Sequence, residues 1–152
     1  MAFEELYADV TYADTYHSTR GNSDWASLTA SQKYGALVYA SEYLDNNFDW
    51  YSTILDTSQI RDWPRRDYYS SQGRLITGIP TAIKNATCEL ALAHTKDSLI
   101  YNANEGLKSQ SFGDASETYS GTSGAKAFSA IKISLSEYGT SGKTKVNIIW
   151  RA

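Results

Sequence analysis

Cysteine, methionine, proline and histidine are all scarce in this chain of 152 residues, which contains one, one, two and two of them. A single cysteine, Cys88, cannot form an intrachain disulfide, and this usage fits a reducing compartment. The two histidines, His17 and His94, have no second histidine or cysteine at ligand spacing nearby. The sequence therefore predicts no metal site and no cofactor.

Long apolar runs are also missing. No window approaches the roughly 20 apolar residues that a membrane-spanning helix needs. The first five residues, Met1–Glu5, contain neither the basic region nor the apolar stretch of a secretory signal. We therefore expect a soluble protein that contacts no membrane and is made in the cytosol.

Basic charge is in slight deficit. The chain has 14 Lys and Arg against 17 Asp and Glu, a formal net charge of −3 and a pI near 5.3. A general nucleic-acid binder is expected to show a basic face or domain. No such segment is visible in the sequence, although the fold can still bring scattered cations together.

Tyrosine and tryptophan, in contrast, are abundant, with 12 and 4 copies. These side chains pair a large apolar face with a polar tip, a combination favoured at protein–protein contacts. A tyrosine-rich core in an ordinary small domain is an equally good explanation of the composition.

Apolar periodicity predicts three main helices, over residues 29–45, 80–95 and 125–138, and a short one within 7–20. Thr29 and Gln32 have the spacing of a capping box, which fixes the start of the first main helix. Pro80 is a structural residue at the start of the second, because proline lacks an amide hydrogen and is tolerated in a first helical turn.

The remaining segments read as irregular or extended. Residues 46–79 form a long aromatic connection, and residues 97–123 suit a β-hairpin or a flexible arm. The C-terminal tail, 143–152, alternates like a strand and would dock either on its own domain or on another subunit. Its apolar side comprises Val146, Ile148 and Trp150.

Together these segments predict a mainly α fold. We expect a small bundle of three to four helices with a β-hairpin or extended arm and an extended C-terminal tail. Residues 1–142 would form a single helical domain, and residues 143–152 a docking tail.

Motifs for catalysis are weak. The segment Gly139–Thr144 resembles the end of a phosphate-binding loop, but Glu137 occupies the place of the first glycine and the segment follows a helix. We interpret it as a flexible helix terminator. Cys88 suits a helical core, and His94 a helix end where positive charge is favourable. Carboxylates are scattered, so the sequence predicts no enzyme.

The most distinctive segment is Asp62–Asp67, in which a tryptophan, a proline and two arginines follow one another in an otherwise acidic chain. Pro64 fixes its own φ and pushes Trp63 toward an extended conformation, which gives the indole a defined direction. Arg65 and Arg66 carry planar guanidinium groups suited to carboxylates, phosphates or aromatic faces. We interpret Trp63 as a core residue that shapes the loop and the arginines as outward contact residues.

Several segments within residues 7–95 follow one another in a particular order. This order points to a protein family more specifically than any single segment does. The segments are Tyr7–Tyr16, Trp25, Lys33–Asp45, Trp63-Pro64-Arg65, Gly78-Ile79-Pro80 and Ile83–Ala91. In this order the chain resembles the head–tail connector (adaptor) proteins of tailed bacteriophages. That group includes proteins named as DnaT-like single-stranded-DNA-binding proteins. Downstream only Phe112-Gly113 echoes the family's glycine-centred hairpin.

The resemblance implies a structural subunit in a closed homo-oligomeric ring of about twelve copies, with head-to-tail interfaces. Its implied partners are the portal protein, a tail or nozzle protein, and DNA that passes through the channel without sequence-specific binding. The implied location is the head–tail interface of the virion, after assembly in the cytoplasm of the bacterial host. The residues that we expect at subunit or portal contacts are Arg65, Arg66, Val146, Ile148, Trp150 and Arg151.

A single-stranded-DNA-binding protein of the replication type is the alternative function. Aromatic rings beside arginines are how such binders hold bases and phosphates, whereas the acidic charge counts against it. A small hydrolase that uses carboxylates is a third possibility with no motif behind it.

Overall fold

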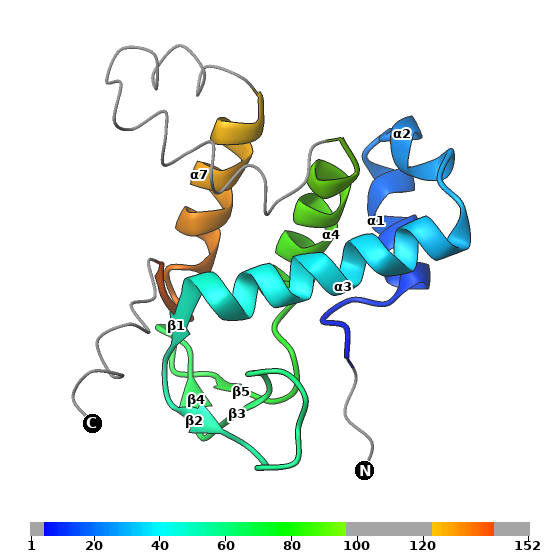
Figure 1. Ribbon diagram of the computed structural model, residues 1–152. Coiled ribbons are helices and arrows are strands. Elements are labelled where there is room, and N and C mark those ends of the chain that lie inside the picture. Colours follow the sequence, from blue (N-terminus) through cyan, green and yellow to red (C-terminus); the bar gives the residue numbers. More distant parts are fainter. Residues whose placement is uncertain (1–4, 97–122, 142–152) are drawn as a thin grey trace, which may run out of the picture.

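The computed structural model describes residues 5–96 and 123–141 (Figure 1). Most of the predicted arm at 97–123 and the whole predicted tail at 143–152 lie outside these residues. The described part of the chain has five helices and six short strands. The helices are α1 (Val10–Thr19), α2 (Ser23–Ala26), α3 (Ala30–Asn47), α4 (Thr81–Lys96) and α7 (Ser123–Leu135).

Local hydrogen bonds explain where the first helices begin. The Asp9 carboxylate accepts a hydrogen bond from the backbone N–H of Tyr12 at 2.7 Å and so caps α1. At the start of α3, Thr29 Oγ1 accepts from the Gln32 N–H at 3.1 Å, and the Thr29 N–H donates to Gln32 Oε1 at 2.9 Å. The predicted capping box is therefore confirmed.

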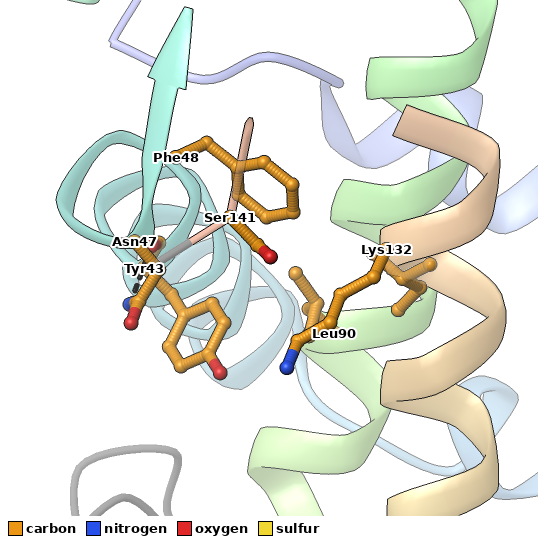
Figure 2. Close-up of a pocket in the computed structure, with 7 residues that line it drawn as sticks. Tyr43, Asn47, Phe48, Leu90, Lys132 and Ser141 are labelled. Atoms are coloured by element: carbon orange, nitrogen blue, oxygen red, sulfur yellow. Dashed lines mark hydrogen bonds between the residues drawn. The ribbon is translucent and has the colours of Figure 1, made fainter. Parts of the chain in front are cut away.

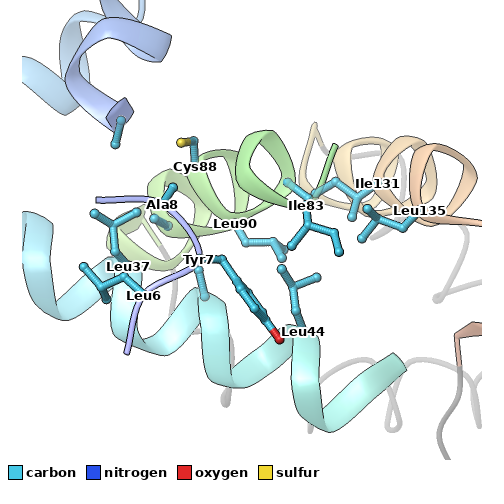
Figure 3. Packing of buried hydrophobic residues seen from close by; sticks show 14 of the residues in the cluster. Leu6, Tyr7, Ala8, Leu37, Leu44, Ile83, Cys88, Leu90, Ile131 and Leu135 are labelled. Carbon is cyan, nitrogen blue, oxygen red and sulfur yellow. The ribbon is translucent and has the colours of Figure 1, made fainter. Parts of the chain in front are cut away.

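The core forms where α3 packs against α4, and α7 closes one end of it (Figure 3). Alanines on both helices let the backbones approach, while the larger side chains between them fill the space. The N-terminal segment lies along α3 and also contributes buried residues. Buried positions include Tyr7, Ala36, Leu37, Ala40, Leu44, Ile83, Ala86, Leu90, Ala91, Ile131 and Leu135.

The prediction of a mainly α bundle is wrong, because the described residues form a mixed α/β fold. Three antiparallel pairs, β1–β6, β2–β3 and β4–β5, accompany the helices. Strands of two or three residues are too short to leave an alternating pattern in the sequence. They are β1 (Phe48–Trp50), β2 (Thr53–Ile54), β3 (Arg65–Arg66), β4 (Tyr68–Tyr69), β5 (Leu75–Ile76) and β6 (Gly139–Ser141).

The pairs sit at defined places around α3. Strands β2–β5 gather below α3 in Figure 1, whereas α4 and α7 rise above it. We call residues 51–76 the strand lobe. No helix of the described residues is long and apolar enough to cross a membrane.

Gly139 lies where β6 packs closely against β1. It pairs with Trp50 across the β1–β6 ladder, so the segment predicted as a flexible helix terminator instead begins as strand β6, Gly139–Ser141. A Cβ atom at Gly139 would lie 2.7 Å from the Asp49 carbonyl oxygen and 3.0 Å from both Trp50 Cα and Trp50 Cε3. Only glycine fits this contact without displacing backbone atoms.

Candidate functional site

The Trp63-Pro64 step lies at the junction between the helical core and the strand lobe. Its peptide bond is cis, and the Trp63 side chain is only 1% exposed. Trp50, Tyr68 and Tyr138 meet the indole edge-on, with ring centroids 5.6–6.0 Å away. Trp63 therefore lies in the core and fixes the position of the loop.

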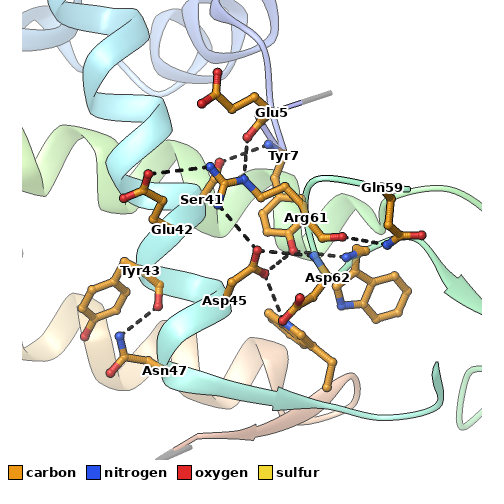
Figure 4. A network of polar contacts seen from close by, with 12 residues as sticks. Glu5, Tyr7, Ser41, Glu42, Tyr43, Asp45, Asn47, Gln59, Arg61 and Asp62 are labelled. Atoms are coloured by element: carbon orange, nitrogen blue, oxygen red, sulfur yellow. Dashed lines mark hydrogen bonds and ion pairs between the residues drawn. The ribbon is translucent and has the colours of Figure 1, made fainter. Parts of the chain in front are cut away.

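A carboxylate at the end of α3 holds this junction together (Figure 4). Asp45 Oδ1 accepts hydrogen bonds from the Tyr7 hydroxyl and from Trp50 Nε1, the latter at 3.3 Å. Asp45 Oδ2 accepts from the Asp62 N–H at 3.3 Å and lies 3.7 Å from Arg61 Nη1. One side chain thus ties the N-terminal segment, β1 and the loop to α3.

Burial shapes the ionisation of this polar network. Desolvation raises the pKa of Asp45, although the hydrogen bond from Tyr7 and the charge of Arg61 oppose that shift. The pKa of Tyr7 is also raised, first by burial and then by the Asp45 charge. The Tyr7 hydroxyl in turn accepts a hydrogen bond from the Trp63 N–H at 3.2 Å. Sequence reasoning missed this network because Asp45 marks only a helix end in the local sequence.

The Arg65 guanidinium is held by backbone carbonyl groups. Nε donates to Tyr51 O at 2.9 Å, and Nη1 donates to Asp62 O at 3.0 Å. Nη2 donates to Ser52 O at 2.5 Å and to Trp50 O at 3.2 Å. Burial lowers the pKa of Arg65. The side chain is therefore a clamp across the turn between β1 and β2.

The other predicted contact residues are placed differently. Arg66 is exposed and donates from Nη2 to Leu55 O at 2.6 Å. Pro80 is buried immediately before α4. Contact with another subunit through Arg65 and Arg66 stays a prediction. The remaining contact residues, Val146, Ile148, Trp150 and Arg151, lie outside the described residues.

Most cationic side chains of the described residues are engaged by the protein itself. Acidic partners hold Lys33, Arg61 and Lys96, and tyrosine rings lie beneath Arg20 and Lys84. Arg65 and Arg66 donate to backbone carbonyl groups, so Lys132 and Arg74 are the exceptions in the part of the chain that the structure describes. The described surface therefore offers few free cations for a phosphate backbone.

Large apolar side chains, in contrast, are exposed on the strand lobe. Five of the eight that the described residues leave exposed belong to it, and Ile60 and Tyr69 are the most open of these five, at 60% and 59%. Large exposed apolar patches mark interaction surfaces, so the concentration of these side chains in one segment favours a contact surface there. The five are Tyr51, Leu55, Ile60, Tyr69 and Leu75.

A small cavity of about 130 Å³ lies between the end of α3, α4 and α7 (Figure 2). Its walls combine three apolar side chains with four that carry a polar group. The Lys132 ammonium and the Tyr43 hydroxyl point toward the same space. Sequence reasoning missed this site, because its residues come from four separate segments. They are Tyr43, Asn47, Phe48, Leu90, Ile131, Lys132 and Ser141.

The histidine and cysteine side chains lie in contacts that stabilise the fold. His17 Nε2 donates to Cys88 O at 3.0 Å, and His17 Nδ1 accepts from the Asn22 side-chain amide at 2.9 Å. Burial lowers the pKa of His17 and raises that of Cys88 to about 12. His94 stacks on Tyr39 with ring centroids 4.4 Å apart. No group of three or more potential metal ligands comes together among the described residues.

Comparison with known proteins identifies a family. A family described as "Putative DnaT-like ssDNA binding protein" matches residues 4–152, almost the entire chain. No curated protein and no solved structure matches.

Proposed function

Because the chain belongs to the DnaT-like family, and because the order of its motifs resembles phage connector proteins, we propose that it is a structural subunit of a head–tail connector. In this role it joins a homo-oligomeric ring beneath the portal, extends the DNA channel and offers a docking face to the tail. The family match supports the DnaT-like name, and the connector role is the finer proposal.

The exposed apolar side chains of the strand lobe carry this proposal. Subunit contacts use large apolar and aromatic anchors, whereas single-strand binding needs, besides stacking aromatic rings, free cations along a groove. The described residues have the first feature, with Ile60 and Tyr69 open, and little of the second. The fixed geometry of the Trp63 junction would hold these anchors in place. A net charge of −3 also suits a channel through which DNA slides.

The proposal can be tested on phage particles. The purified protein is mixed with tail-less particles that contain a portal, and the vertex is imaged by cryo-electron microscopy. We expect added ring density at the portal vertex. Ile60→Asp should remove this density, because a charge cannot be buried unpaired at an apolar contact. Ile133→Asp is the matched control, since Ile133 is 74% exposed but lies on α7 outside the lobe. Absence of density with the unmodified protein refutes the proposal.

Binding of single-stranded DNA is the second candidate function. The family description supports it, and the free Lys132 beside a cavity provides one place where a phosphate can be held. A titration of fluorescent oligonucleotide at several salt concentrations tests it, because phosphate contacts weaken as salt rises. Binding that is absent at low salt excludes this function and leaves the connector proposal standing.

A further inference from the structure

The cavity at the end of α3 has the size of one six-membered ring. Its volume is about 130 Å³, and an apolar cavity of roughly 150 Å³ in another protein holds benzene. Phe48, Leu90 and Ile131 supply apolar walls, and the Tyr43 ring lies beside them. A single aromatic ring can therefore enter, whereas the second ring of a purine would extend toward the mouth of the cavity.

Polar groups at the cavity favour a polar ring over a hydrocarbon one. The Asn47 amide N–H donates to Tyr43 O at 2.8 Å, which leaves the Asn47 side-chain oxygen as an acceptor. Ser141, at the end of β6, has a hydroxyl without a partner among the described residues. A phenyl ring would desolvate both groups and leave them unpaired, which is costly. A pyrimidine, with donors and acceptors on its edge, can satisfy them.

Lys132 supplies the charge that a nucleotide needs. It lines the cavity from α7, and its ammonium has no ion pair or hydrogen bond within the described residues. The other unpartnered cation of this part of the chain, Arg74, follows the turn before β5 and does not line the cavity. An apolar ring-sized space and a free ammonium thus coincide at this site.

We propose that this cavity binds a single pyrimidine nucleotide of a DNA strand, with the base between Tyr43 and Leu90 and its phosphate at Lys132. The inference goes beyond the connector role and rests on the second candidate function. A pyrimidine is preferred over a purine because the cavity encloses one ring, so that the longer fused ring system of a purine is left partly outside it. One cation implies one phosphate contact at this site.

Fluorescence anisotropy with labelled dT12 and dA12 tests the inference. We expect the unmodified protein to bind dT12 more tightly than dA12. Lys132→Ala should weaken dT12 binding about fivefold and reduce the slope of log K against log salt by about 0.7, the value for one phosphate of a single strand. Ser141→Phe, which places a ring at the mouth of the cavity, should weaken it at least about tenfold and abolish the preference for pyrimidine.

Arg74→Ala is the matched control, because it removes one unpartnered positive charge away from the cavity. It should keep the preference for dT12. Thermal unfolding of each variant confirms that the cavity substitutions leave the chain folded. If folded Lys132→Ala and Ser141→Phe variants bind dT12 like the unmodified protein, the cavity is not the site, although strand binding stands. If the unmodified protein binds neither oligonucleotide, the inference and the second candidate function both fail.

Discussion

Replacing Gly139 by alanine would place a methyl group where β1 leaves no room. The added Cβ would lie 2.7 Å from Asp49 O and 3.0 Å from Trp50 Cα, and both are backbone atoms that cannot rotate away. Overpacking of this kind costs about 1–3 kcal/mol. The lower conformational entropy of alanine in the unfolded chain offsets about 0.5–1 kcal/mol. We therefore expect Gly139→Ala to destabilise the fold by about 1–2 kcal/mol.

Gly35→Ala is the matched control for this substitution. Gly35 lies within α3 and has nothing within 4 Å of a built Cβ, so alanine should stabilise the helix by about 0.5–1 kcal/mol. Urea unfolding followed by tryptophan fluorescence measures both. With an m-value of about 2 kcal/mol/M, the Gly139→Ala midpoint should fall by about 0.5–1 M and the Gly35→Ala midpoint should rise. A Gly139→Ala midpoint equal to or above that of the unmodified protein would refute the packing of β6 against Trp50.

Three further predictions concern the clamp, the buried histidine and the tail. Arg65→Lys should lower the free energy of unfolding by about 2 kcal/mol, because an ammonium cannot reach all the carbonyl groups to which the guanidinium donates. Exposed Arg66→Lys should lower it by less than about 0.5 kcal/mol. Equal losses in the two variants would contradict this prediction. Since burial lowers the pKa of His17, the unfolded chain takes up the proton more readily, so the unfolding free energy should fall as the pH drops below about 6.5. Between pH 7.5 and pH 5.5, His17→Gln should lose less unfolding free energy in denaturation experiments than the unmodified protein does. An equal loss in both proteins would contradict this prediction. Deletion of residues 143–152 should impair assembly in sedimentation experiments while circular dichroism shows a folded monomer; intact assembly would exclude the docking role of the tail.

Local signals predicted the helices well. Thr29 and Gln32 indicate the start of α3, because a capping box is made by residues that lie three apart in the sequence. Pro80 similarly indicates the start of α4. The long helices bury a periodic apolar face, and this pattern is visible without the fold. Their bounds shifted where a tertiary contact intervened. α7, for example, ends at Leu135 because the chain turns to pair Gly139 with Trp50.

Long-range contacts could not be read from the sequence. Asp45 meets Tyr7, Trp50 and a backbone N–H of the loop, and these groups lie 38, 5 and 17 residues away. The β1–β6 pair likewise joins segments that lie on either side of α4 and α7 in the chain. The cavity at Lys132 depends on the same arrangement, because α7 must pack beside α4 before it exists. The loop at Trp63 stood out by composition, but its partners emerged only with the fold.

The connector role is tested most directly by locating the protein in mature virions. Cryo-electron microscopy of the portal vertex, without imposed symmetry, should show a ring of copies beneath the portal in which the α3–α4 core and the strand lobe fit the density. Mass spectrometry of the same particles should detect the chain. Virions that lack the protein, or a portal vertex whose density is fully explained by other chains, would contradict the account.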